Sequence, residues 1–289
     1  MNNLLYNFIA YTIVGKLKNI AYAMLASSIW GISFPITKAG LFKISPILLA
    51  FLRYLIATFI FIFLFSFKKN FFKIEIKKFS FLGLFSVTFP TVFQNIGLKY
   101  TSAYISGFLQ STGPIFILIL AFIFLNEKIT RNKLIGIAMA FIGTYFIVNP
   151  NEGNFLGNFL ILLSSFSYSI GGIISKNLLK KYSPFQVIFF SSLFGTTFLF
   201  PLIFLEKFFI LKGAFNYVLY LAIFPTIISY ILWYSAMKKM EISRLSFFVY
   251  LVPIFSIIAS HIVLKEKFIP YTIFWGFIVI TGVFIAQKA

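Results

Sequence analysis

Ten long apolar stretches limit what this chain can fold into. Each runs for 18 to 27 residues with almost no charge, which is the length of helix that crosses a hydrocarbon layer of about 30 Å. The stretches are Ile20–Thr37, Pro46–Phe67, Phe79–Leu98, Tyr100–Asn126, Leu134–Asn151, Gly153–Ser175, Tyr182–Leu205, Gly213–Met237, Leu245–Leu264 and Phe268–Gln287. Only 11% of the residues are charged, against roughly 25% in an ordinary soluble domain. The sequence therefore predicts an all-α polytopic membrane protein with ten transmembrane helices.

The charged residues predict the orientation of these helices. The formal net charge is +19, which is also typical of nucleic-acid-binding proteins, but here the basic residues lie in the short connectors. When connectors are assigned alternately to two sides, 17 of the 25 Lys and Arg fall on side one, which holds both termini, 7 fall on side two, and Arg53 lies inside a helix. Because cytoplasmic connectors carry the excess of Lys and Arg, we expect a protein of the cell (inner) membrane with both termini in the cytoplasm and no nucleic-acid partner.

A duplicated segment indicates two homologous halves. The sequence "PIFILILAFIFLNEK" at 114–128 and "PIFSIIASHIVLKEK" at 253–267 agree at eight of fifteen positions, and "ASSIWGISFPITK" at 26–38 aligns with "SSFSYSIGGIISK" at 164–176. We therefore expect an N-terminal extension at 1–15, a first five-helix repeat at 16–150 and a second at 153–289. Five is an odd number, so the second repeat enters the membrane inverted. Inverted repeats that meet at the midplane are typical of secondary transporters.

The sequence also resembles the drug/metabolite transporter superfamily, specifically its ten-helix EamA type. The resemblance lies in "WGISFPITK" (30–38), in "SPILLAFLRYLIA" (45–57), and in "LNEKITRNKLIGIAMAFIGTYFIV" (125–148) with its second copy "LKEKFIPYTIFWGFIVITGVFIA" (264–286). Membership implies an inner-membrane carrier of small organic metabolites, often amino acids and frequently in the export direction. One departure between the halves is that Ser191 stands where the first repeat has Arg53.

Arg53 is the one cation within an apolar stretch. It comes seven residues after Pro46, and a cation there costs about 2.5–3.5 kcal/mol, so it should face protein or a water-filled cavity. It either docks a carboxylate or phosphate in bidentate fashion, or it has a structural role, in which it contacts helix-end carbonyls or extends outward to the interface.

Polar and aromatic residues near the helix centres are candidates for a substrate cavity. With Arg53, the predicted binding residues are Trp30, Ser33, Thr91, Gln94, Asn95, Gln110, Tyr168, Tyr230, Trp233 and Tyr250. Amides are costly in hydrocarbon, so they should point inward, where they contact substrate or tie helices together.

The two repeats carry equivalent residues that are candidates for gating and for helix interruptions. Lys38 and Lys176 end equivalent helices on opposite sides, where they act as gate charges or extend to the interface. Gly31 with Pro35, and Gly171 with Gly172, predict interruptions in the same helices.

The acidic residues argue against chemistry within the membrane. All six are Glu, and each lies in a connector or at a helix end. Glu127 and Glu266 are expected to cap the helix that follows each of them. Without a midplane carboxylate or any Cys, the chain offers no usual metal-ligand or nucleophile–base set, so we expect no enzyme, no metal and no cofactor. We also expect facilitated transport or exchange rather than proton coupling.

The leading hypothesis is a secondary transporter that moves a small organic metabolite by alternating access, with an amino acid or related carboxylate-bearing compound as the first candidate and export or facilitated exchange as the expected mode. The alternatives are a carrier of sugar phosphates, nucleotide sugars or small hydrophobic drugs, or, as a different class, a channel or passive membrane subunit. The expected partners are a small-molecule substrate and membrane lipid, with the chain a monomer or weak homodimer.

Overall fold

The computed structural model describes residues 2–65, 73–148, 154–265 and 272–288, with side chains from residue 14 onward except near the gaps. The first half contains α1 (Asn2–Leu41), α2 (Pro46–Phe65), α3 (Ile76–Gly83), η1 (Leu84–Thr88), α4 (Phe89–Tyr100), α5 (Ala103–Gln110), α6 (Gly113–Leu125) and α7 (Arg131–Val148). The second contains α8 (Phe155–Leu178), α9 (Pro184–Leu202), η2 (Ile203–Leu205), α10 (Ala214–Leu221), η3 (Ala222–Ile228), α11 (Ser229–Lys239), α12 (Ile242–Ser246), η4 (Phe247–Leu251), α13 (Val252–Leu264) and α14 (Thr272–Gln287).

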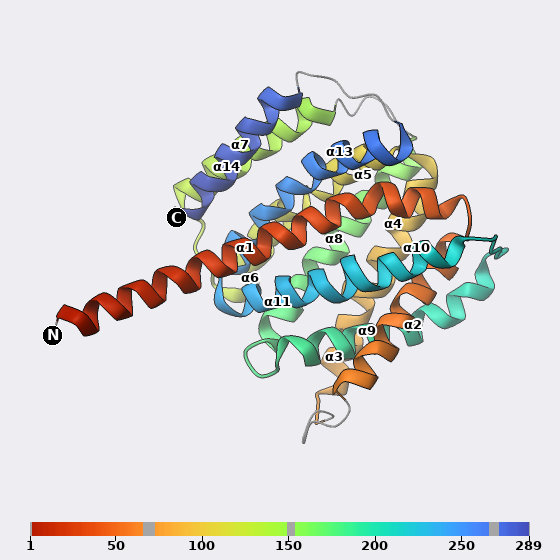
Figure 1. Cartoon of the computed structure of the whole chain (residues 1–289), viewed down its shortest axis with the longest axis horizontal. Helices are drawn as coiled ribbons and strands as arrows, with labels where there is room; N and C mark the ends of the chain where they lie inside the picture. Colours follow the sequence, from red (N-terminus) through yellow and green to blue (C-terminus); the bar gives the residue numbers. More distant parts are fainter. Residues whose placement is uncertain (1, 66–72, 149–153, 266–271, 289) are drawn as a thin grey trace.

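These helices confirm the prediction of an all-α polytopic membrane protein. Within the described residues, eight helical segments are long and apolar enough to cross a membrane, and each coincides with a predicted stretch. The remaining two stretches correspond to α7 and α14. The helix α1 begins at Asn2, so the apolar run at 4–14 extends the first helix, and Figure 1 shows this end projecting beyond the bundle.

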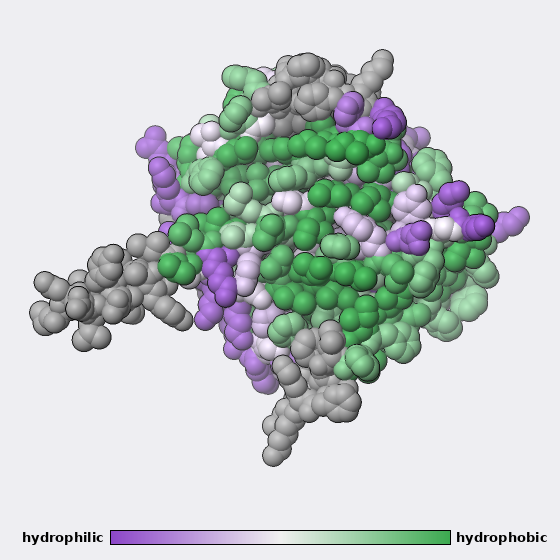
Figure 2. Space-filling view, viewed as in Figure 1, coloured by the Kyte–Doolittle hydropathy of each residue, from purple (hydrophilic) through white to green (hydrophobic). Residues whose placement is uncertain are grey.

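The outer surface has the apolar character that lipid requires. Phe63, Phe155 and Phe204 are 81%, 85% and 71% exposed, and Figure 2 shows apolar side chains spread across the bundle face with polar groups near its ends. Exposed apolar area on this scale would cause a water-soluble protein to aggregate. The surface is therefore matched to a bilayer.

The packing of the helices repeats between the halves (Figure 1). The helix α1 packs against α11 and α13, while its counterpart α8 packs against α4 and α6; α2 packs against α9, and α7 against α14. Asn126 and Lys265, 139 residues apart, both end their helices in the left-handed region with φ of 56° and 58°. The duplication seen in the sequence is thus also present in the packing.

Contacts between connectors define the two sides. On side one, Lys181 after α8 pairs with Glu75 before α3, with Nζ and Oε1 2.9 Å apart. On side two, the Ser45 amide between α1 and α2 donates to the Phe209 carbonyl before α10 at 3.1 Å. Thus α1 ends on side two and α8 ends on side one, so the two halves run in opposite directions as the odd helix number requires.

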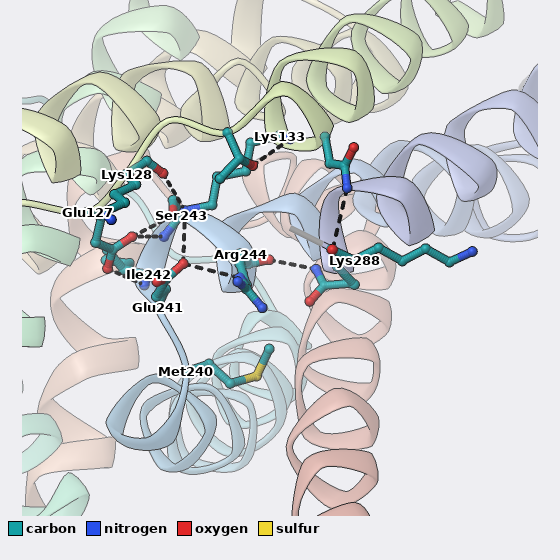
Figure 3. A network of polar contacts seen from close by, with 12 residues as sticks. Glu127, Lys128, Lys133, Met240, Glu241, Ile242, Ser243, Arg244 and Lys288 are labelled. Atoms are coloured by element: carbon teal, nitrogen blue, oxygen red, sulfur yellow. Dashed lines mark hydrogen bonds and ion pairs between the residues drawn. The ribbon is translucent and has the colours of Figure 1, made fainter.

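A polar network on side one joins the halves (Figure 3). The amides of Ile242 and Ser243 donate to the Glu127 carboxylate at 2.8 and 3.0 Å, and the Ser243 hydroxyl donates to it too. Glu127 therefore caps α12 of the other half, and the expectation that it caps the next helix is wrong. The corresponding Glu266 lies outside the described residues.

The same network holds a buried lysine (Figure 3). The Lys133 side chain is 1% exposed, and its ammonium donates to the Lys128 carbonyl at 2.9 Å and to Glu241 at 2.8 Å. Partial burial opposes ionisation of Glu241, but the hydrogen bond and charge of Lys133 outweigh it and hold the pKa of this carboxyl below its ordinary value. The contact stabilises side one at neutral pH.

The helix interruptions do not lie where the glycines predicted them. The helix α1 continues unbroken through Gly31 and Pro35, because Gly31 serves close packing: a Cβ there would meet the Val252 carbonyl at 2.7 Å. Gly171 likewise lies within α8, against the Phe85 carbonyl. The irregular turns are instead the π-helical η1 and η3 and the 3-10 helices η2 and η4.

Candidate functional site

A cavity of about 110 Å³ lies between the two halves. Its lining begins at Gln94, about two turns before the side-two end of α4, and extends to Met237 in the last turn of α11 on side one. Eight of the eleven predicted binding residues line it. They are Trp30, Ser33, Arg53, Gln94, Gln110, Tyr168, Tyr230 and Trp233.

Arg53 is held in the cavity wall by a residue of the second half. Its side chain is 5% exposed, and its Nε donates to the Thr226 hydroxyl at 2.6 Å. Its guanidinium lies 5.2 Å from the centre of the Tyr54 ring. In the described part of the chain, no carboxylate forms an ion pair with it. The charge of Arg53 therefore faces the cavity without a counter-ion from those residues.

Aromatic rings form a second wall from both halves. The Trp30 ring centre lies 4.9 Å from that of Trp233 and 5.4 Å from that of Tyr230. The Trp30 indole N–H donates to the Pro225 carbonyl at 2.9 Å, and the Tyr230 hydroxyl donates to the Tyr168 hydroxyl at 3.2 Å. These contacts fix the rings, since a buried indole or phenol group needs a hydrogen-bond partner.

Amides add polar groups to the mainly apolar lining. The Gln94 side chain is 7% exposed, and within the described residues its amide makes no hydrogen bond. The Gln110 side-chain oxygen accepts from the Ser164 hydroxyl at 3.3 Å. Gln94 is therefore available to a bound solute, whereas Gln110 also ties α5 to α8.

Three predicted residues lie away from the cavity. The Asn95 amide donates to the Pro46 carbonyl at 2.9 Å, which ties α4 to the start of α2. The Thr91 hydroxyl donates to the Tyr54 hydroxyl at 3.3 Å. Tyr250 is fully buried in η4, and its hydroxyl has no partner among the described residues. These side chains contribute to packing between helices.

Several lining residues were missed by the sequence reasoning. They include Ser86, Tyr234, Met237 and Ile242. Tyr234 follows Tyr230 by one helical turn, so helical spacing contained its signal. Ser86 had no such signal, because it lies in the π-helical η1, where the residues that face inward depart from the α-helical period.

The two predicted gate lysines make equivalent contacts within their own halves. The Lys38 ammonium donates to the Thr101 carbonyl at the end of α4 at 2.7 Å. The Lys176 ammonium donates to the Met237 and Met240 carbonyls at the end of α11 at 2.6 and 2.5 Å. Neither lysine lines the cavity. Both cap a helix C-terminus, where cations complement the dipole.

A cavity between two inverted five-helix halves in a lipid-facing bundle is typical of membrane transporters. The model of the EamA-like transporter family matches the chain twice, at residues 17–149 and 155–287. The chain belongs to this family, and it is a transporter rather than an enzyme.

Similar proteins include transporters of archaea and bacteria. An uncharacterized transporter of Archaeoglobus fulgidus is 33% identical, covering 91% of this chain and 96% of that protein. The probable amino-acid metabolite efflux pump of Escherichia coli is 25% identical, covering 93% and 94%. One solved crystal structure aligns with a TM-score of 0.78 over 93% of this chain and 96% of the other at 15% identity, a likeness that concerns the fold alone.

Proposed function

We propose that this transporter is a secondary carrier of a small carboxylate-bearing metabolite, with an amino acid as the leading candidate. The observation that carries the proposal is Arg53, a cation buried in the cavity wall without a carboxylate partner among the described residues. The carboxylate of a bound solute supplies the missing counter-charge.

The chemistry of the guanidinium supports a carboxylate. A planar guanidinium binds a carboxylate through two parallel N–H donors, and such charge-assisted bonds are about twice as strong as neutral ones. The insertion cost of about 2.5–3.5 kcal/mol for a cation at this depth is a reason for such a group to be retained for binding.

The aromatic wall supports a solute that also carries an ammonium or apolar group. Trp30, Tyr230 and Trp233 lie together on this wall, and a cation over such rings gains about 0.5–2 kcal/mol. An amino acid presents both the anion for Arg53 and the cation for the rings. The Escherichia coli relative, named as a probable amino-acid metabolite efflux pump, supports the same class of solute and the export direction.

Transport by alternating access fits the size of the cavity. Its volume of about 110 Å³ is below the roughly 300–1,000 Å³ of ordinary ligand pockets, so the wall opens to admit a metabolite. Rocking of one inverted half against the other opens it to either side. In the proposed orientation, the protein lies in the inner membrane and side one faces the cytoplasm. The solute moves down its own concentration gradient, by facilitated export or exchange.

The test begins with a thermal-shift screen of the purified protein. Amino acids, organic acids and sugar phosphates are compared with amides and decarboxylated analogues of the same compounds. We expect stabilisation by carboxylates and none by their matched amides. A preference for sugar phosphates, or for neutral hydrophobic compounds, would replace the carboxylate proposal.

A substitution then ties any hit to the cavity. Arg53→Ala should raise the KM for transport about 10- to 100-fold, because hydrogen bonds to a charged group contribute about 1.5–3 kcal/mol. Arg244→Ala is the matched control, because that arginine pairs with Glu241 on side one at 3.1 Å. Unchanged flux in Arg53→Ala would remove the docking role.

A further inference from the structure

The π-helical turn η3 contacts two of the cavity residues of the first half, Arg53 and Trp30. η3 spans Ala222–Ile228 and contains Pro225. Proline has no amide hydrogen, so it leaves a carbonyl one turn earlier without its usual donor. The Thr226 hydroxyl donates to the Leu221 carbonyl at 2.8 Å, across the widened turn. This bond orients the Thr226 oxygen as an acceptor.

That oxygen accepts from Arg53. The Arg53 Nε donates to it at 2.6 Å, and both side chains are nearly inaccessible, at 5% and 0% exposed. A guanidinium presents two edges to a carboxylate, one through Nε and one through its two terminal nitrogens. Because Thr226 occupies Nε, the edge formed by the two terminal nitrogens is the one left for a carboxylate in the cavity.

The same turn orients the aromatic wall. The Pro225 carbonyl accepts the Trp30 indole N–H at 2.9 Å, so adjacent residues of η3 hold Arg53 of α2 and Trp30 of α1. A π-helical turn inside a helix is rare and occurs often at functional sites. Here it links the second half to two cavity side chains of the first, Arg53 and Trp30.

The first half has a similar turn that does not hold an arginine. In η1, the Thr88 hydroxyl lies 3.3 Å from the Gly83 carbonyl five residues earlier, and 3.3 Å from the Gly195 carbonyl of α9. Its side chain is also buried, at 1% exposed. Both halves therefore have the threonine and the widened turn, but among the described residues Thr226 bonds to a cation whereas Thr88 bonds to backbone carbonyls.

We infer that Thr226 is a positioning residue that fixes the Arg53 guanidinium for carboxylate recognition, an inference that rests on the proposed function of Arg53. The carboxylate binds Arg53, and Thr226 acts by holding the Arg53 guanidinium in one orientation. Loss of the hydroxyl leaves Nε without its acceptor and allows the guanidinium to turn.

The experiment compares Thr226→Val, Thr226→Ser and Thr88→Val in liposomes with the best carboxylate from the screen and its neutral amide analogue. Thr226→Val should raise the KM for the carboxylate about tenfold, as expected for a lost bond to a charged group, with little change in maximal rate. The KM for the amide should stay constant. Thr226→Ser keeps the hydroxyl and should behave as wild type, as should Thr88→Val.

Each of the following outcomes contradicts the inference. Equal loss for carboxylate and amide in Thr226→Val indicates a structural role only, and so does an equal effect of Thr88→Val. A Thr226→Ser variant that loses carboxylate preference also contradicts it. If Thr226→Val does not fold, Thr226→Ala is measured in its place. The Arg53→Ala variant separates failure of the proposed function from failure of the positioning role. If Arg53→Ala retains the preference for the carboxylate, the proposed function is wrong. If Arg53→Ala loses this preference while Thr226→Val keeps it, only the positioning role of Thr226 is wrong.

Discussion

Arg53 illustrates what single residues reveal in a membrane sequence. A cation inside an apolar stretch is so costly that the sequence predicts it to face protein or a water-filled cavity, and Arg53 lines the cavity. Its Thr226 partner did not follow, because the two residues are 173 positions apart and belong to different halves. Of the two adjacent amides that the sequence placed at the binding site, Gln94 lines the cavity, whereas the Asn95 amide donates to the Pro46 carbonyl. Adjacent residues on a helix point in different directions, and only the packing decides which one faces the solute.

Glu75 provides a pH-dependent prediction at the residue scale. Its bonds with Lys78 and Lys181 lower the pKa of this carboxyl from 4.5 to about 2. A lowered folded-state pKa stabilises the protein above the unfolded value, and this contribution disappears as pH falls toward the folded value. The melting temperature of wild type should therefore exceed that of Glu75→Gln above about pH 5 and approach it between pH 4.5 and 2. A difference that stays constant over this range would contradict the assignment.

At the scale of elements, the apolar stretches were predictable and their internal irregularities were not. Length and hydropathy locate a membrane helix, but the π-helical η1 and η3 depend on hydrogen bonds to carbonyls five residues back. One signal was present: "FPT" occurs at 89–91, directly after η1, and at 224–226, within η3. Gly31 and Gly171 led to the prediction of interruptions at the wrong positions. Glycine is used for close helix packing as well as for bends, and at these two positions it serves close packing.

The cap that Glu127 forms on α12 leads to a stability prediction. Glu127→Ala removes the acceptor for two amides and one hydroxyl at the start of α12, and should lower the free energy of unfolding by about 1–3 kcal/mol. Glu127→Gln retains one oxygen and should fall between this variant and wild type. Thermal unfolding in detergent is the measurement, with Lys128→Ala as the neighbouring control. A Glu127→Ala protein as stable as Lys128→Ala would show that the cap contributes nothing.

The contact of α7 with α14 depends on small residues. A Cβ at Gly136 would lie 2.6 Å from the Gly282 carbonyl, whereas one at Gly276 has nothing within 4 Å. Gly136→Val should therefore separate the helices and cost about 1–3 kcal/mol, and Gly276→Val on the same helix pair should not. Thermal unfolding of both variants checks this, and equal melting temperatures would contradict the packing described here.

For the whole molecule, the duplication and the helix number were available from the sequence, since they rest on repeated motifs and lengths. The small volume of the cavity and the exchange of contacts between halves were not, because they arise from side-chain packing across distant segments. The assignment of side one to the cytoplasm rests on the bias of 17 to 7 basic residues.

The orientation is testable because the chain contains no Cys, so an introduced thiol is the sole labelling site. Lys180 and Lys212 are both exposed, in connectors on side one and side two. In intact cells, a membrane-impermeant maleimide should label Lys212→Cys and leave Lys180→Cys unlabelled until the membrane is opened. The reverse pattern would place both termini outside.

Counterflow in proteoliposomes tests the central claim that this protein is a carrier. Labelled carboxylate identified in the screen is added outside vesicles loaded with the same unlabelled compound. Uptake should saturate, should be accelerated by the trapped compound, should persist without a pH gradient, and should be lost or weakened in Arg53→Ala. Uptake that rises linearly with concentration and ignores the trapped compound would identify a pore, and the alternating-access account would then be wrong.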